Sequence, residues 1–273
     1  MIADSHQKKR PGADSPILCL ILLVLLVFTT TETVADQNSD TSAKTLRVGV
    51  TDFPPYIMFN NAQAEGIAWD LLEAAAELRG IKLVASEVPR ARLETFISEK
   101  RIDAALRPLH WTPEPERFSF SDTFLHSWQI LFFTADTQTL YETMEDLTGQ
   151  TIAAQLGMPC PPLEPMFEEG AIHRFDVQSL RALFDHLLAS SEIDAAVTDL
   201  YSGLWVIHQN DWNEQISVAE QPLEEVGHRI MFHSDHDEFV EHFNATLASM
   251  RSNGKLSDIK DRYLSDLTPP DNL

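Results

Sequence analysis

Two short apolar segments, each followed by a polar turn that contains proline, constrain this chain more than any other feature. Leu46–Thr51 leads into the turn Asp52–Tyr56, and Asp103–Leu106 leads into the turn that begins at Arg107. In α/β proteins, strands that end this way present side chains and free backbone amides to a cleft at the carboxyl edge of the sheet. We therefore predict an α/β fold whose functional site includes these two turns.

The segments between these strands alternate between helical and strand patterns. Trp69–Arg79 carries apolar residues at helical spacing and stops at Gly80, and Ile81–Val88 is typical of a strand. Arg92–Lys100 follows as a short helix, and Gln129–Thr134 is apolar throughout, as expected of a buried strand. This order predicts a mostly parallel sheet flanked by helices.

A second α/β unit begins near Leu147. Its predicted elements are the strand Thr151–Gln155, the helix Ser179–Ser190, the strand Ile193–Val197 and the helix Asp199–Ile207. The pentapeptides Arg101–Ala105 and Glu192–Ala196 are similar, and each opens a strand after a helix. We therefore expect two lobes of similar architecture.

The C-terminal part adds one strand and two helices. The strand is predicted at Arg229–Phe232, and the helices at Glu238–Arg251 and Leu256–Leu264. Gly254 lies between the two helices, where a residue with a left-handed conformation commonly ends a helix.

The N-terminus has the features of an export signal. Ile17–Phe28 is an unbroken run of twelve apolar residues after Lys8, Lys9 and Arg10, shorter than the ~20 residues that a membrane-spanning helix needs. We predict a signal peptide over residues 1–35, cleaved after Ala35, and a disordered lead-in over residues 36–45. A tilted membrane anchor is the alternative. Cys19 opens the apolar run, which makes it a poor site for lipid attachment.

The charge of the chain excludes some partners. The formal net charge is −22, and the predicted signal peptide contributes nothing to it because its acidic and basic residues cancel. Nucleic acids and anionic membranes are therefore not expected to bind. Cys160 is the only cysteine after the signal peptide, so no intramolecular disulfide can form in the mature chain, and we expect a passive thiol.

Several short motifs, taken in order, resemble the periplasmic solute-binding proteins of ABC importers, family 3, the type that binds polar amino acids. These motifs are Leu46–Tyr56, Gly66–Leu72, Glu99–Ala104, Phe118–Asp122, Leu147–Gly157 and Phe239–Leu264. Each is weak alone, but their order after a signal peptide is specific. The resemblance extends from Thr45 to Leu264.

The resemblance implies a type II periplasmic-binding-protein fold with two lobes. The first lobe is expected over residues 46–133 and 230–273 and the second over 134–229, with strands crossing near Phe132–Ala135 and Arg229–Met231. The lobes of such a protein close on a solute by hinge motion. The resemblance further implies a monomer in the periplasm. It would bind a small polar or anionic solute, an amino acid or a related compound, and deliver it to an ABC permease in the inner membrane. No enzymatic activity, cofactor or metal is expected.

The resemblance also indicates candidate ligand-binding residues. Asp199 matches the acid that holds an α-ammonium group in this family, although a helix N-cap is the alternative role for an aspartate at this place. Tyr56 matches an aromatic wall, and Asp52 lies in the same turn. Gly157 would let a backbone amide approach an anion. Met158 replaces the usual threonine, which removes one hydroxyl donor.

The chain departs from the family where the ligand carboxylate is normally held. The family places an arginine clamp about three residues after the position of Thr112, where this chain has Glu114 and Pro115. Arg107 replaces a small strand-end serine. The clamp has therefore either moved to Arg107, with Arg92 as a second candidate, or is absent. The neighbouring side chains of the same turn, His110 and Trp111, complete the candidate site, with Trp128 as another possible aromatic wall.

Three alternatives remain open from the residues alone. His228, His233, Asp235 and His236 could coordinate zinc, but their spacing matches no recognised ligand pattern. The same fold could carry an enzyme similar to cyclohexadienyl dehydratase, with a cleft carboxylate as general acid. It could also serve an orphan sensor that presents its ligand to a receptor.

Overall fold

The computed structural model describes residues 44–137, 141–270 and 273. The predicted signal peptide, its membrane-anchor alternative and nearly all of the predicted lead-in lie outside these ranges. The last lead-in residue, Thr45, instead begins the first strand. Within the described residues, no helix is long and apolar enough to cross a membrane.

The first sheet has five strands in the order β4-β1-β5-β13-β6. Their bounds are β1 Thr45–Val50, β4 Lys82–Glu87, β5 Ala104–Leu106, β6 Phe118–Phe120 and β13 Ile230–His233. The strands of the βαβ units, β1 with β4 and β1 with β5, pair in parallel. Strand β13, which brings the chain back from the second sheet, pairs antiparallel with β5 and β6. A small hairpin of β2 (Met58–Asn60) and β3 (Gln63–Glu65) follows the first turn.

The second sheet contains β11, β7, β10, β8 and β9 in that order, with β12 paired to β7. The bounds are β7 Leu125–Thr134, β8 Thr151–Gln155, β9 His173–Val177, β10 Ala195–Asp199, β11 Ile216–Val218 and β12 Glu224–His228. Here too the βαβ strands are parallel, and β7 pairs antiparallel with its three neighbours. The predicted two-lobed α/β fold is therefore confirmed, with mixed sheets.

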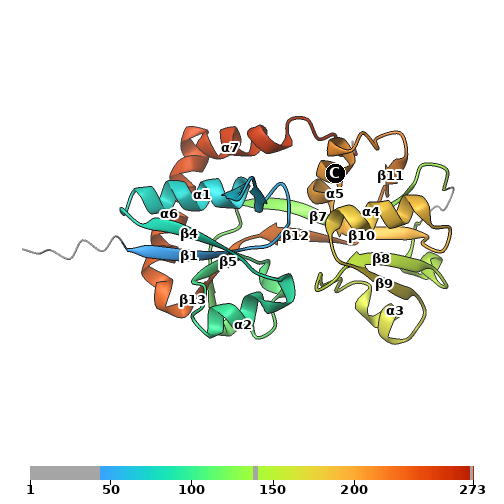
Figure 1. Cartoon of the computed structure of the whole chain (residues 1–273), viewed down its shortest axis with the longest axis horizontal. Helices are drawn as coiled ribbons and strands as arrows, with labels where there is room; N and C mark the ends of the chain where they lie inside the picture. The colour runs from blue at the N-terminus through green and yellow to red at the C-terminus, as the bar shows by residue number, and fades with distance from the viewer. Residues whose placement is uncertain (1–43, 138–140, 271–272) are drawn as a thin grey trace, which may run out of the picture. The chain divides into compact units, whose positions relative to one another are not determined.

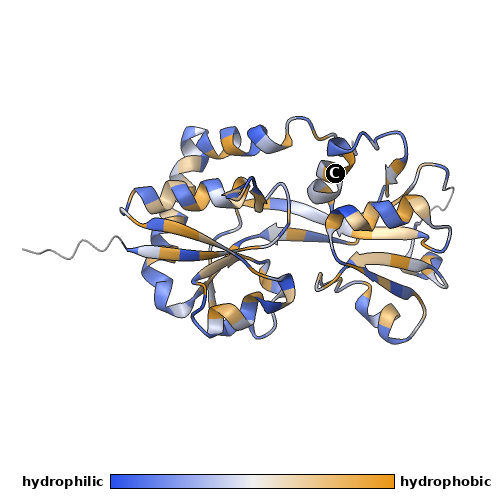
Figure 2. Cartoon of the chain, viewed as in Figure 1, coloured by the Kyte–Doolittle hydropathy of each residue, from blue (hydrophilic) through white to orange (hydrophobic). Residues whose placement is uncertain are grey.

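Each sheet is flanked by its own helices (Figure 1). The first lobe has α1 Ile67–Glu77, α2 Leu93–Ser98, α6 Asp237–Asn253 and α7 Lys255–Leu264, and the second has α3 Glu164–Glu168, α4 Leu180–Ala189 and α5 Leu200–Gln209. Apolar residues concentrate in the strands and on one side of the helices (Figure 2). Gly254 has φ +85°, and so supplies the left-handed turn that the sequence predicted between α6 and α7.

Each lobe has a large apolar core, called the first and the second core below, and a third, smaller cluster that includes Ile97 and Met231 adds to the first lobe. Val48, Leu71 and Phe243 belong to the first core, and Ile152 and Leu183 belong to the second. All five side chains are buried. Complete burial of one such side chain contributes about 2 kcal/mol, so each lobe is a stable body around its own sheet.

The chain crosses between the sheets earlier than the sequence predicted. Phe132 pairs with Ala196 and Val218 inside the second sheet, so the expected crossing at Phe132–Ala135 is wrong. The chain instead leaves the first sheet after Phe120 and enters β7 at Leu125. It returns through β12, whose register pairs His228 with Leu125. Figure 1 shows β7 and β12 side by side between the two sheets.

The C-terminal segment also differs from the expectation that residues 230–273 all belong to the first lobe. Tyr263 packs against the first core, and its hydroxyl donates to Asp70 at 3.1 Å. Leu267, three residues after α7 ends, is buried in the second core. The chain therefore links the two lobes a third time.

The two similar pentapeptides have a common structural role. Asp103 accepts the backbone N–H of Arg47 at 2.7 Å, and Asp194 accepts the backbone N–H of Thr151 at 2.7 Å. In each case the backbone N–H of the aspartate donates back to the carbonyl of the same partner, at 2.7 and 2.9 Å. Each aspartate thus joins the beginnings of two neighbouring parallel strands.

Asp103 makes further contacts with the Arg47 side chain. The Nε and Nη2 atoms of Arg47 donate to its carboxylate at 2.9 and 2.5 Å. Burial alone would raise the pKa of Asp103, but the hydrogen bonds and charge of Arg47 outweigh burial and lower that pKa. An aspartate with a lowered folded-state pKa stabilises the protein above its ordinary pKa and loses this effect as the pH falls through the folded value.

We expect Asp103→Asn to reduce the free energy of unfolding by about 2 kcal/mol at pH 7, because the charged hydrogen bonds from Arg47 are lost. Urea denaturation measures this change, and exposed Asp136 provides the control Asp136→Asn, expected within about 0.5 kcal/mol of wild type. The difference between wild type and Asp103→Asn should shrink as the pH is lowered from 7 to below the ordinary pKa of aspartate, because Asp103 becomes protonated there. A difference that is constant over this range would contradict the assignment.

Candidate functional site

Asp199 lies at the end of β10 and is completely buried. Its side chain caps helix α5, because Oδ1 accepts the backbone N–H of Ser202 at 3.2 Å. The same oxygen accepts the Tyr56 hydroxyl at 2.7 Å, and Oδ2 faces Nε2 of His228 at 3.0 Å. Since a carboxylate oxygen only accepts, Nε2 of His228 carries the proton. The N-cap alternative for Asp199 is therefore what the structure shows.

Tyr56 reaches Asp199 from the first lobe. Its ring packs against that of His228 with 4.0 Å between centroids and against Phe53 with 5.1 Å. The side chain has no exposed surface. Burial and the nearby Asp199 carboxylate raise the pKa of Tyr56 well above its ordinary value. The phenol is therefore protonated at neutral pH and remains a donor to Asp199.

Strands β7 and β12 supply the remaining polar groups of this interior. His228 ends β12, and Gln129 of β7 donates its amide to the carbonyl of Pro159 at 2.7 Å. Nδ1 of His228 and Oε1 of Gln129 are buried without hydrogen-bond partners among the described residues. His228 was considered in the sequence only as a metal ligand, and its role beside Asp199 was missed.

A cavity of about 400 Å³ is connected to this buried cluster through Arg90, which lines the cavity and lies over the ring of Phe53, the neighbour of Tyr56. The first lobe lines it with residues 51 and 52 after β1 and residues 87–91 at the end of β4, and the second lobe lines it with Gln155, Leu156 and Gln178. Because both lobes contribute, a hinge motion of the lobes would change the size of this cavity.

Arg90 is the charged residue of this cavity that sequence analysis missed. The whole residue is 9% exposed, and its Nε and Nη2 atoms have no hydrogen-bond partner among the described residues. Its guanidinium lies 4.4 Å from the centre of the Phe53 ring. Burial and the nearby Arg107 lower the pKa of Arg90 to about 10, against the opposing effect of Asp52 and Asp199. Arg90 is thus a cation at neutral pH.

Arg107 is buried as predicted for an inward-pointing residue, but it has a partner. Its Nη2 atom forms an ion pair with Glu94 at 2.6 Å, and burial lowers its pKa while Glu94 opposes this effect. Arg92 is exposed in the short 3₁₀ turn Arg90–Arg92. Of the two expected clamp candidates, neither lines the cavity; their neighbour Arg90 does.

The other predicted residues have varied positions. Asp52 lines the cavity, and burial raises its pKa. Trp111 packs in the first core and donates its indole N–H to Glu224 at 2.9 Å. His110 is exposed, 3.5 Å from the other oxygen of Glu224. Met158 is buried in the first core, so it joins the lobes by packing.

Gly157 has φ +77°, a conformation that glycine adopts without strain. A Cβ atom at this position would lie 3.2 Å from Cβ of Ala91. The glycine therefore allows the loop after β8 to approach the turn after β4 closely, at the edge of the cavity.

The residues considered for metal binding do not converge. His228 contacts Asp199, whereas His233 lies 3.6 Å from Asp235 and His236 lies 3.4 Å from Asp103. Within the described residues, no group of three or more acidic, histidine or cysteine side chains is arranged to hold a metal ion. Cys160 is buried, and burial raises its pKa to about 12, so its thiol remains protonated at neutral pH.

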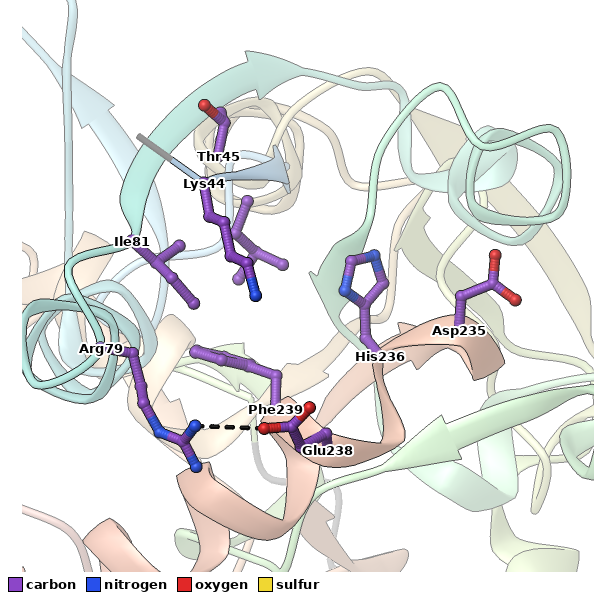
Figure 3. Close-up of a pocket in the computed structure, with 9 residues that line it drawn as sticks. Lys44, Thr45, Arg79, Ile81, Asp235, His236, Glu238 and Phe239 are labelled. Carbon is purple, nitrogen blue, oxygen red and sulfur yellow. Dashed lines mark hydrogen bonds and ion pairs between the residues drawn. The ribbon is translucent and has the colours of Figure 1, made fainter. Parts of the chain in front are cut away.

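A second cavity, of about 370 Å³, lies at the opposite end of β1 (Figure 3). Lys44 and Ile81 line it together with the Arg79–Glu238 ion pair at 3.1 Å. It lies beside the start of β1, whereas the first cavity lies beyond the strand's carboxyl end. It therefore shares no residue with the polar cluster around Asp199.

The fold and the cavity between its lobes define a binding protein for small solutes. Residues 46–266 match the family described as bacterial extracellular solute-binding proteins, family 3, and the chain belongs to this family.

Individual relatives agree with this assignment. The chain is 25% identical over 255 residues to the arginine-binding extracellular protein ArtP of Bacillus subtilis (strain 168), covering 90% of this chain and 97% of that protein. A mutant of the arginine-binding protein from T. maritima is similar in structure, with TM-score 0.70 and 22% identity over 81% of this chain and 96% of that one. A histidine kinase sensor domain has TM-score 0.70 and 19% identity, over 83% and 98% of the two chains.

We expect Tyr56→Phe to lower the free energy of unfolding by about 2–3 kcal/mol, because a hydrogen bond to a buried carboxylate is lost. Thermal or urea unfolding measures the change. Tyr141→Phe is the control, since the hydrogen bond of its hydroxyl among the described residues is a weak one to the Met144 sulfur at 3.6 Å, and a loss below about 0.5 kcal/mol is expected. Equal losses in both variants would contradict a special role for the Tyr56–Asp199 bond.

Gly157→Ala should destabilise the chain more than Gly170→Ala. Both glycines have positive φ, +77° and +72°, so each variant loses about 1 kcal/mol from backbone strain. A Cβ atom at Gly170 would meet no atom within 4 Å, whereas one at Gly157 would press on Ala91. Equal losses in urea denaturation would show that the loop does not approach Ala91 in solution.

Proposed function

We propose that this chain binds a small polar or anionic solute, an amino acid or a related compound, between its two lobes. One observation carries the proposal: Arg90 lines the cavity between the lobes, and two nitrogen atoms of its buried guanidinium have no hydrogen-bond partner among the described residues. A buried charge without a partner is costly. A solute that brings an anionic group removes this cost, and so is favoured over water in the cavity.

The proposed mechanism is closure of the lobes about β7 and β12. The solute enters the open form, and contacts from both sides of the cavity shift the population toward the closed form. An ABC permease in the inner membrane then receives the solute from the closed form. The family assignment and a relative named for arginine binding support this role.

The proposal also covers location and activity. The N-terminal signal peptide directs the chain to the periplasm, where it acts as a monomer. It acts as a binder and not as an enzyme, and the protonated, buried Cys160 offers no nucleophile that would support catalysis.

Thermal unfolding of the exported protein tests this function. Cells expressing the full chain provide the secreted form, which is heated with a panel of amino acids, organic acids and small amines. A solute at 100 times its Kd adds about 2.7 kcal/mol to the free energy of unfolding, and the midpoint should rise by about 5–10 °C. Sodium chloride at equal ionic strength is the control. The absence of any shift across the panel would contradict solute binding.

A further inference from the structure

The carboxylate of Asp199 is already occupied in this structure. Tyr56, His228 and the Ser202 backbone supply three donors within 3.2 Å, and the residue has no exposed surface. Two of these donors bind Oδ1 and one binds Oδ2, so of the about four acceptor positions of a carboxylate one remains, on Oδ2. Because Asp199 is completely buried, an ammonium group could reach this position only if the surrounding side chains moved apart. The resemblance implied that Asp199 holds the ligand ammonium, and these contacts argue against that role.

Charges that lack partners lie instead around the neighbouring cavity. Asp52 and Glu87 both line it, and among the described residues neither carboxylate has a hydrogen-bond or ion-pair partner. Arg90 lines the same cavity with its own unpartnered nitrogen atoms. A group of either sign alone would satisfy one side of this cavity and be repelled by the other. A molecule that carries both charges satisfies both sides.

We propose that this cavity binds a zwitterion, with its carboxylate on the Arg90 guanidinium and its cationic group against Asp52 and Glu87, while Asp199 makes no direct contact. The inference rests on the proposed function and specifies where the solute binds and in which direction. A planar guanidinium with free Nε and Nη2 atoms can donate two parallel hydrogen bonds to one carboxylate.

The surroundings are consistent with this orientation. Arg107 adds positive charge near Arg90. Its Nη2 atom pairs with Glu94 at 2.6 Å, and its Nε and Nη1 atoms have no hydrogen-bond partner among the described residues, but only Arg90 of the two lines the cavity. Gln155 and Gln178 line the cavity from the second lobe, and their amides can donate to or accept from the solute. The zwitterion would thus contact both lobes and favour their closure.

Calorimetric titration tests the proposal, first with the twenty common amino acids on the wild-type protein. For the amino acid that binds most tightly, the amine lacking its carboxylate and the acid lacking its α-ammonium are titrated next. We expect each analogue to bind about 10–100-fold more weakly, the factor expected for one charged hydrogen-bonded contact.

Two arginine variants then locate the carboxylate. Arg90→Gln should weaken binding of the amino acid by about 10–100-fold and leave binding of the amine unchanged, because the amine has no carboxylate to lose. Arg92→Gln, the same change at an exposed position two residues away, should alter neither. In the same way, Asp52→Asn with Glu87→Gln should weaken binding of the amino acid and not of the deaminated acid.

Stability measurements separate binding from folding. Without solute, Arg90→Gln should unfold at the wild-type temperature or above, since an unpaired buried charge is removed. If that variant does not fold, Arg90→Lys keeps the charge and loses the paired hydrogen bonds, and it should weaken amino-acid binding about tenfold. A variant that folds and binds the amino acid like wild type would overturn the proposal.

Other outcomes distinguish this inference from the proposed function. Binding of another solute but of no amino acid would leave the proposed function standing and overturn the zwitterion site. Loss of amino-acid binding in Asp199→Asn but not in Arg90→Gln would place the ligand at Asp199 and overturn the proposal. Absence of binding by every solute would overturn both.

Discussion

The buried carboxylate of Asp199 is the constraint on which the centre of this molecule depends. A carboxylate without exposed surface requires donors, and these come from three places: the turn after β1, the end of β12 and the first turn of α5. Ser202 adds a further contact, because its hydroxyl donates to the carbonyl of Pro54 at 2.5 Å. The hydrogen bonds that satisfy one acid therefore also join the two lobes.

The polar groups that hold the two lobes together are therefore different from the charged groups that are available to bind a solute. In the Asp199 cluster the carboxylate binds the Tyr56 hydroxyl and Nε2 of His228. Among the described residues, the charged groups of Asp52, Glu87 and Arg90, which line the cavity, form no hydrogen bond or ion pair. Polar groups that are mutually satisfied make a rigid structure, and unsatisfied ones remain available to a solute. The specificity of the proposed site thus depends on residues that surround Asp199 more than on Asp199 itself.

The helices, strands and turns that depend on the local spacing of apolar residues and glycines were predicted correctly from the sequence. Apolar spacing predicted α6, and Gly254 predicted its end, because both follow from the geometry of a helix. The position of Arg90 could not be predicted, since Arg90 and Arg92 flank one alanine in a 3₁₀ turn and only the packing of that turn decides which is buried. The start of β7 was missed for a similar reason: two adjacent polar residues, His126 and Ser127, interrupt the apolar pattern of Leu125–Trp128, and the pairing of this segment with β12, about a hundred residues away, decides its conformation.

The path of the C-terminal segment has a consequence for motion. Helix α7 is attached to α1 through Asp70, which accepts hydrogen bonds from Arg262 at 2.5 Å and Tyr263 at 3.1 Å, while Leu267 is buried in the second core. Only residues 264–266 separate these two attachments. If β7 and β12 were the only connections, the two lobes could rotate widely relative to each other. Residues 264–266 form a third connection, which must extend as the lobes move apart. The range of opening is therefore limited by a chain segment that lies outside both the hinge and the cavity.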